Sequence, residues 1–482
     1  MNKRFAVCRI VAATLTVFAL GACTLAPHYE RPDAPMPASY PQYESTTAQQ
    51  KASADAQAPA ADVLSDWRAF VQDAYLRQLI ELALKNNRDL RQAALKVAQY
   101  EAEYRIVRAE LGPSITATGT HSVSHQSGTT TKSTSLELGT SAWEIDFFGR
   151  IRSLKDQALE QYLSTDAARR STQISLISTT ASDYLTWLSD RALLDVTERT
   201  VASYRDTYET TLRAANLGSG SMEDVQSART SLTSAMSSLA AYRRAVEQDR
   251  NNLIAAIGSP LPEGFPDDRA LPDESLFATV PEGLPSTLLT ERPDIIEAEH
   301  TLKSANAYIG AARAAFFPSV SLTATGGVAS NGLSSLFKAG SGAWAFEPSI
   351  SVPIFEFGSL RATLDSAKIS KNIYIAAYEG TIQTAFKEVS NALAARATYV
   401  DQTAADAQYV DAAQQYYDIA NSRYRGGLDS FLTLLTAQRT LFSAQTQLVT
   451  DRAAQQTNMV TLYTALGGGW RKDAEASETA AK

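Results

Sequence analysis

The feature that most limits how this chain can fold is a long stretch without helix-breaking residues. Residues 359–425 contain no proline and a single glycine, Gly380. Apolar side chains recur there at spacings of three and four, as at Leu360, Leu364 and Ala367, which places them on one stripe of a helix. At 1.5 Å per residue, this helix would be roughly 100 Å long. A periodic run of that length without caps indicates a coiled coil.

The long stretch ends in a turn and then runs back. Gly426 and Gly427 interrupt the pattern, and residues 428–466 resume it without glycine or proline, which predicts a helical hairpin. The same arrangement occurs earlier, with residues 150–217 and 221–257 as arms. Matching landmarks in the two parts lie about 205 to 210 residues apart, so the sequence predicts an internal duplication.

The N-terminus has the pattern of a bacterial targeting segment. Lys3, Arg4 and Arg9 precede an apolar core at 10–20, which is too short to span a bilayer. Leu20-Gly21-Ala22-Cys23 then resembles a lipobox, so we predict cleavage before Cys23 and a covalent lipid on Cys23, with no other cofactor. The alternative is an ordinary signal peptide followed by a chance cysteine. Cleavage leaves one cysteine, so no intramolecular disulfide is expected.

Two segments follow an alternating pattern instead. Residues 113–148 predict two strands around a polar loop at 126–133, with a bulge near Gly139, and residues 317–358 repeat the pattern. Such alternation, with aromatic residues near strand ends, is typical of transmembrane β-barrels, although a half-buried hairpin in a soluble domain is the alternative. Because no apolar run of about eighteen residues follows the targeting segment, a membrane crossing would have to use strands. Four strands cannot close a barrel, so two, three or four copies would have to associate, giving 8, 12 or 16 strands.

Charge and residue types argue against other functions. The formal net charge of -8 argues against nucleic-acid binding, which usually needs a basic face. His121 and His125 lack a third ligand, and neither a zinc-protease motif nor a phosphate loop occurs, so we expect no metal site and no enzyme.

The segments expected along the chain are a lipoprotein signal peptide (1–22), an extended tether (23–65), a helical equatorial segment (66–112), strands 1 and 2 (113–148), the first long helical hairpin (149–257), a crossover with equatorial helices (258–316), strands 3 and 4 (317–358), the second long hairpin (359–466) and a polar tail (467–482).

Several motifs in a fixed order give the chain a family resemblance. They are the lipobox, the proline-rich tether, Arg292-Pro293-Asp294-Ile295, the run Ala311-Ala312-Arg313-Ala314-Ala315-Phe316-Phe317-Pro318-Ser319, Pro348-Ser349-Ile350 and Ala465-Leu466-Gly467-Gly468-Gly469. Together they resemble the TolC-type outer-membrane efflux family, in the lipoprotein branch that contains OprM and MtrE. The resemblance covers nearly the whole mature chain.

This resemblance implies a mainly α-helical fold with a β-barrel part. Three copies would form a twelve-stranded barrel in the outer membrane, continued by an α-helical tunnel in the periplasm. Family members are passive ducts for drugs, detergents, dyes and other toxic compounds. An inner-membrane pump of the resistance-nodulation-division type loads them, and a periplasmic adaptor connects the two.

The resemblance also implies a gate at the hairpin tips. Asp224 matches an acidic tip residue that bonds a tyrosine on the other hairpin, and Tyr424 matches that tyrosine. Asp224 alone could equally serve the positive end of its own helix. The tips Gly218, Ser219, Gly220, Ser221, Arg425, Gly426 and Gly427 would receive the adaptor, or be plain turns.

The constriction is expected on residues 428–439. Leu432 matches the apolar ring residue of the branch and Arg439 its nearby arginine, although Leu432 could simply pack in a helical seam. Relatives place aspartates in this turn, where this chain has Thr433 and Thr436. We therefore expect weak divalent-cation block, with closure depending on Leu432 packing and on the Asp224–Tyr424 link.

Three other functions stay open from the sequence. An exit channel for secreted proteins or for metal ions would share this fold. The five Met and four His residues are scattered, whereas metal exporters of this type tend to carry more. A trimeric coiled-coil adhesin is more remote, because it needs strict heptads and one terminal anchor rather than a duplicated unit.

Overall fold

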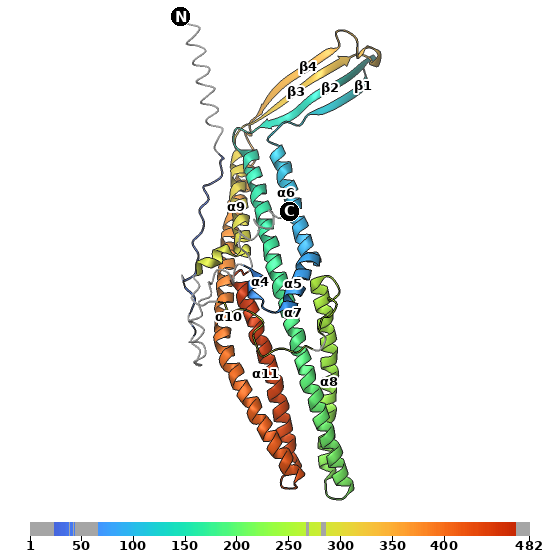
Figure 1. Cartoon of the computed structure of the whole chain (residues 1–482). Helices are drawn as coiled ribbons and strands as arrows, with labels where there is room; N and C mark the ends of the chain where they lie inside the picture. The colour runs from blue at the N-terminus through green and yellow to red at the C-terminus, as the bar shows by residue number, and fades with distance from the viewer. Residues whose placement is uncertain are drawn as a thin grey trace. The chain divides into compact units, whose positions relative to one another are not determined.

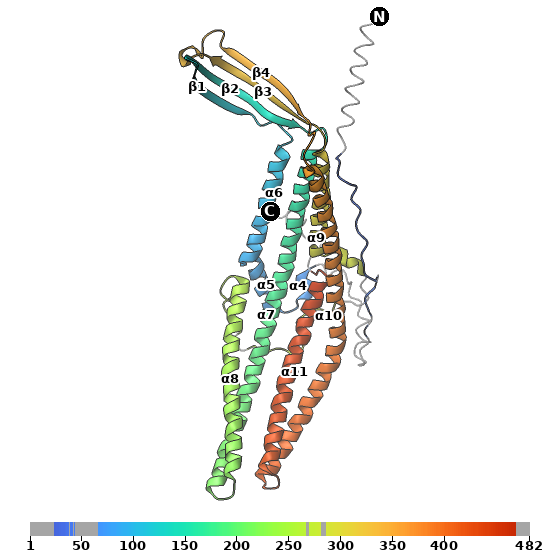
Figure 2. The same cartoon turned by 180° about the vertical axis from the view of Figure 1, so that it is seen from behind.

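The structure is a computed structural model that describes residues 24–37, 39–41, 43, 66–266, 269–280 and 286–468. The predicted signal peptide, Cys23 with its lipid, and the tail from residue 469 lie outside the described residues. The elements are α4 (Trp67–Phe70), α5 (Ala74–Asn86), α6 (Arg88–Ala109), β1 (Thr116–Gln126), β2 (Thr129–Ile145), α7 (Arg150–Asn216), α8 (Met222–Ile257), η1 (Ser286–Glu291), α9 (Pro293–Ala314), β3 (Ser319–Ser330), η2 (Leu333–Ser335), β4 (Gly342–Ser351), α10 (Ser359–Arg425) and α11 (Phe431–Ala465) (Figures 1 and 2).

The chain divides into two compact units, each of which is described by itself. Unit 1 comprises Met1–Ala34, Ala94–Ala168 and Asp294–Thr381, and unit 2 comprises Pro35–Ala93, Arg169–Pro293 and Ile382–Lys482. Unit 1 holds the sheet and α9. Unit 2 holds the turns of both long hairpins.

The sheet of unit 1 is antiparallel and follows the order β1-β2-β3-β4 (Figure 1). Its register shifts between Thr140 and Trp143, where Ala142 has a φ of 50°, so a bulge does lie close to Gly139. Gly139 itself must lack a side chain, because a Cβ there would come 2.2 Å from the carbonyl oxygen of Ala324 on β3.

The predicted loop at 126–133 is wrong. Only Ser127 and Gly128 separate β1 from β2, and both have positive φ, 53° and 80°. Two such residues complete a hairpin turn whose twist matches the strands. The β-branched threonines from Thr129 onward therefore pair in the sheet rather than forming a loop.

The long helices predicted from the runs without glycine or proline are present. Helices α7 and α10 are 67 residues each, and α8 and α11 are 36 and 35 residues. Within unit 2, α8 and α11 fold back along α7 and α10, and both turns lie at the same end (Figures 1 and 2). Ala228 of α8 packs with Phe431 and Leu435 of α11, so the two hairpins share an apolar contact.

The helical segment expected at 66–112 is divided into α4, α5 and α6 by two breaks. Asp73 caps α5 by accepting from the N–H of Leu76 at 2.7 Å. Asn87 caps α6 by accepting from the N–H groups of Asp89 and Leu90 at 2.9 and 3.0 Å. Acidic and amide side chains at these positions satisfy the first N–H groups of a new helix, which favours a break over continuation. No helix within the described ranges is long and apolar enough to cross a bilayer.

Candidate functional site at the hairpin tips

Each hairpin reverses through a glycine with a left-handed backbone. Gly218 has a φ of 79° and Gly427 a φ of 71°, a region that residues with a Cβ rarely adopt. Ser221 and Ser430 then cap the returning helices, because their hydroxyls accept from N–H groups of the first turn. All the predicted adaptor-docking residues are exposed in these turns.

An ion pair joins the second tip to the first hairpin. Arg425 Nη2 lies 2.7 Å from Asp206 Oδ2 on α7, with both side chains more than half exposed. Within the second tip, Arg423 Nε lies 3.0 Å from Asp429 Oδ2. The Arg423 guanidinium is the main reason that the pKa of Asp429 is below its ordinary value. The tip thus carries fixed charges of both signs.

Tyr424 contacts α7 rather than Asp224. Its hydroxyl lies 3.5 Å from Thr211 Oγ1, and its ring packs edge-on against Phe431 with centroids 5.9 Å apart. Asp224 is half-buried and makes no hydrogen bond or ion pair with another described residue. The expected Asp224–Tyr424 link is therefore not formed within this chain, because the Tyr424 hydroxyl lies beside Thr211 of α7 instead.

The residues expected at the constriction lie on the first turns of α11. Leu432 is 69% exposed in the single chain. Thr436 donates its hydroxyl to the carbonyl of Leu432 at 2.8 Å, and Thr433 pairs with Ser430 at 3.1 Å. These hydroxyls are occupied by local bonds and carry no charge. Arg439 donates to Ser231 of α8 at 3.0 Å, so it connects the two hairpins.

Sequence reasoning missed a polar junction further along α7. Gln438 of α11 donates through Nε2 to Thr207 Oγ1 at 2.8 Å and to Ser203 Oγ at 3.2 Å. The hydroxyls of Ser203 and Tyr417 of α10 lie 3.1 Å apart. Gln438 is only 4% exposed, and its Oε1 has no hydrogen-bond partner among the described residues. An unpaired buried acceptor costs about 1–3 kcal/mol. One sequence signal could have pointed to this junction: Gln438 lies four residues after Leu434 and so belongs to the same stripe of the helix.

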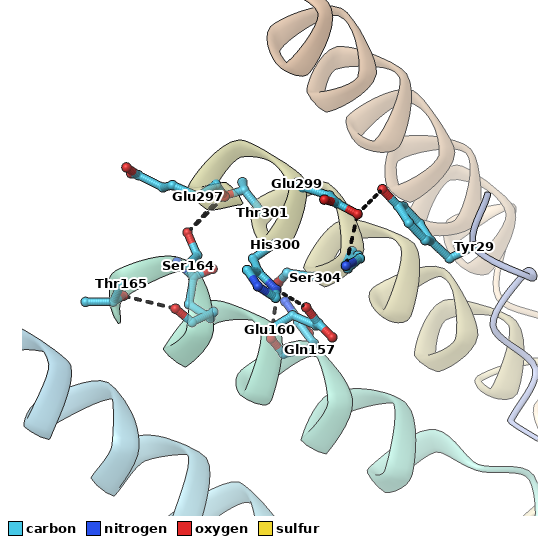
Figure 3. Close-up of polar contacts among 12 residues, drawn as sticks. Tyr29, Gln157, Glu160, Ser164, Thr165, Glu297, Glu299, His300, Thr301 and Ser304 are labelled. Carbon is cyan, nitrogen blue, oxygen red and sulfur yellow. Dashed lines mark hydrogen bonds and ion pairs between the residues drawn. The ribbon is translucent and has the colours of Figure 1, made fainter. Parts of the chain in front are cut away.

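In unit 1, the described start of the tether is fixed to α9. Arg31 pairs with Glu299 through two hydrogen bonds of 3.1 and 2.7 Å, and Tyr29 donates to the same carboxylate at 3.3 Å (Figure 3). Lys303 adds a contact of 3.0 Å. Burial alone would raise the pKa of Glu299, but the bonds from Arg31 and Lys303 outweigh it and hold the pKa below its ordinary value. Residues 24–31 therefore form a strap on α9.

Polar contacts also join α9 to α7 (Figure 3). His300 Nδ1 lies 2.6 Å from Glu160 Oε2, and the hydroxyls of Ser164 and Thr301 lie 3.0 Å apart. Polar contacts between side chains therefore connect α7 and α9, in addition to apolar packing.

The two histidines of the sheet bond to neighbouring strand residues. His121 and His125 each lie 2.9 Å from a threonine hydroxyl on β2. Among the residues that the structure describes, no group of three or more His, Cys, Asp and Glu could hold a metal ion.

Comparisons with known proteins agree with this geometry. A family model described as outer membrane efflux protein matches residues 79–259 and 284–468. The chain is 48% identical to the probable efflux pump outer membrane protein TtgC of Pseudomonas putida, over 96% of each chain. It is 39% identical to the cation efflux system protein CusC of Escherichia coli, over 94% of this chain and 97% of the relative. The open MtrE outer membrane channel of Neisseria gonorrhoeae matches with a TM-score of 0.82 and 34% identity, over 93% of this chain and 98% of that chain.

Long helical hairpins, a small antiparallel sheet and charged tips define a channel-type transport protein. The chain belongs to the outer membrane efflux protein family. It is an outer-membrane protein with a periplasmic extension, and it acts in efflux. The family resemblance and the mainly α-helical fold class with a β-sheet part, both predicted from the sequence, are confirmed.

Proposed function

We propose that three copies of this chain assemble into the exit duct of a tripartite efflux system. An inner-membrane transporter of the resistance-nodulation-division type would load the duct through a periplasmic adaptor. The observation that carries this proposal is the sheet: β1 and β4 are its edge strands, and Trp344, Phe346 and Ile350 of β4 are 82%, 61% and 68% exposed. Unpaired edges and exposed apolar side chains need partners, which further copies supply by closing a ring of strands in lipid.

Organic toxic compounds are the substrate class that the relatives favour. The relatives of 45–48% identity include proteins named for efflux of antibiotics, toluene and solvents, whereas the relative named for cation efflux is 39% identical. Metal ions and secreted proteins are the competing cargoes. The duct would perform no chemistry, and the lipid on Cys23 would be its only covalent group.

The gate would lie at the hairpin tips. The Arg425–Asp206 pair connects the second tip to α7. Leu432 is exposed on the first turn of α11, where it could contact the same residue of other copies. The adaptor would dock on the glycine-containing turns, whose backbone groups are accessible.

Gene deletion with complementation tests this function. Loss of the chain should lower tolerance to antibiotics and solvents, and the intact gene should restore it while divalent-metal tolerance stays unchanged. Cross-linking of the purified protein should give a trimer, and planar bilayers should show conductance. A monomeric, non-conducting protein would refute the duct, and lost metal tolerance alone would move the assignment to metal ions.

A further inference from the structure

The two faces of the sheet in unit 1 differ in their chemistry. Side chains alternate between the faces along each strand, and residues that pair in the register share a face. One face, which we call the apolar face, carries large apolar side chains from three strands: Leu138, Leu322, Trp344 and Phe346. The other, which we call the polar face, carries hydroxyl groups from all four strands: Thr118, Ser135, Thr323 and Ser349. The sheet therefore has one side suited to lipid and one suited to water.

The charged residues of the strands are divided between these faces. The Lys, Arg, Asp and Glu residues of β1 to β4 are Lys132, Glu137, Glu144 and Glu347. All three carboxylates lie on the polar face, because they pair with odd-numbered residues of β3, which share that face with Thr323. Lys132 lies on the apolar face, because it alternates along β2 in step with Leu138. The polar face thus carries charge of one sign.

Two of the three carboxylates have no partner to balance their charge. Glu144 accepts two hydrogen bonds from Arg150, of 2.8 and 2.7 Å. Glu137 and Glu347 form no ion pair and no side-chain hydrogen bond with another described residue. Their partners on β3 are four residues apart, so the two carboxylates lie at two levels about 13 Å apart along the strand.

The predicted constriction at the hairpin tips has a different charge. Thr433 and Thr436 are uncharged, and Arg425 is in an ion pair. Arg439 is exposed and donates to a neutral hydroxyl. Charge at the constriction is therefore balanced or positive, whereas the polar face of the sheet is negative.

We propose that Glu137 and Glu347 make the duct selective for cations, so that amine-bearing compounds pass in preference to carboxylate-bearing ones. This rests on the closed ring of strands proposed above. In that ring the apolar face contacts lipid, so the polar face lines the passage, and each copy adds two unpaired carboxylates. A passage with low-dielectric walls and charges of one sign concentrates ions of the opposite sign. Uncharged compounds pass without regard to these side chains.

Selectivity is measured on the full-length purified protein in planar bilayers, from the reversal potential in a gradient of potassium chloride. Wild type should prefer potassium over chloride by about tenfold at about 0.01 M salt, where charges act over about 30 Å. The preference should be much weaker at about 1 M salt, where charges act over about 3 Å. Glu137→Gln combined with Glu347→Gln should bring the ratio to one or below. Lys132→Gln, which removes a charge from the apolar face of the same sheet, should keep the wild-type ratio.

The variants also report on their own folding, because a chain that has not assembled does not conduct. Glu347→Gln alone, on the edge strand β4, should give an intermediate ratio, which decides the question if the double variant does not insert. A non-selective or anion-selective wild type, an unchanged ratio in the double variant, or a changed ratio in Lys132→Gln would overturn the proposal. Conductance without cation selectivity refutes only this proposal, whereas a wild type that never conducts refutes the duct and this proposal with it.

Discussion

Replacing Asp249 by asparagine should stabilise the first hairpin at alkaline pH and leave it unchanged in acid. Asp249 of α8 is hydrogen-bonded to Asp190 of α7, and Asp183 adds a further negative charge. Neither Asp190 nor Asp183 carries a positive charge. The buried Oδ2 of Asp249 has no hydrogen-bond donor among the described residues unless Asp249 and Asp190 share a proton. Burial first, and Asp190 second, raise the pKa of Asp249 from 3.8 to about 6.

The sign follows from proton binding. Between pH 3.8 and about 6, the folded chain keeps a proton on Asp249 that the unfolded chain has lost. The stabilising contribution of protonated Asp249 is therefore fully present below pH 3.8 and is lost as the pH rises through about 6. At about 1.36 kcal/mol per unit of pKa, the difference between the folded and unfolded pKa of Asp249 corresponds to about 3 kcal/mol. The partial exposure of Asp249 reduces this to about 1–3 kcal/mol. Asparagine cannot ionise, and its amide can donate to Asp190 at any pH.

Thermal unfolding of wild type and Asp249→Asn, followed by circular dichroism, measures the effect. At about pH 8 the variant should melt about 1–3 °C higher, using an unfolding entropy of about 2.1 cal/mol/K per residue, and at about pH 4 the two should coincide. Asp411→Asn, an exposed acid of α10, should change neither value. A variant that is less stable at pH 8, or equally shifted at both pH values, would refute the reasoning about the shared proton.

Three further outcomes follow from the contacts described. Gly310→Ala should lower stability by about 1–3 kcal/mol and release the strap to limited proteolysis, because its Cβ would meet Ala26 N at 2.7 Å and Ser153 Oγ at 2.5 Å. The matched change Gly380→Ala in α10, where a Cβ meets nothing within 4 Å, should instead raise stability by about 0.5–1 kcal/mol. Arg425→Ala should change the melting temperature little, since an exposed pair contributes at most about 1 kcal/mol, yet increase single-channel opening. The exchanged pair Arg425→Asp with Asp206→Arg should restore closure, and unaltered opening in the single variant would argue against a gating role. Glu299→Gln should weaken protection of residues 24–34 from proteases at neutral pH, because Arg31 and Lys303 lose their carboxylate. Wild type should keep that protection down to pH values near the lowered pKa of Glu299, since a depressed pKa gives stability that is lost only as the carboxylate protonates.

The long elements could be predicted because their cause is local. Runs without glycine or proline whose apolar residues recur at spacings of three and four favour long helices, and Gly427, with its left-handed backbone, ends one at a definite place. The breaks at Asp73 and Asn87 were missed because capping there competes with continuation of the helix, and periodicity does not show which one wins.

The contacts between distant segments could not be predicted in the same way. Gln438 and Ser203 meet only because α7 and α11 pack in one register, and a one-residue slip would separate them. The same holds for Arg31 and Glu299, which are far apart in the sequence. The resemblance indicated the tips as the gate, but the contact of Tyr424 with Thr211 depends on how Phe431 packs.

The exposed face of β4 has a consequence for the life of the chain before assembly. A newly exported copy would travel through an aqueous compartment with Trp344, Phe346 and Ile350 uncovered and with two unsatisfied strand edges. Such a surface is an aggregation hazard. Biogenesis therefore requires either a chaperone that covers these residues during transit or assembly of the copies that is faster than their aggregation. The concentration of newly made chains then limits the yield of assembled protein.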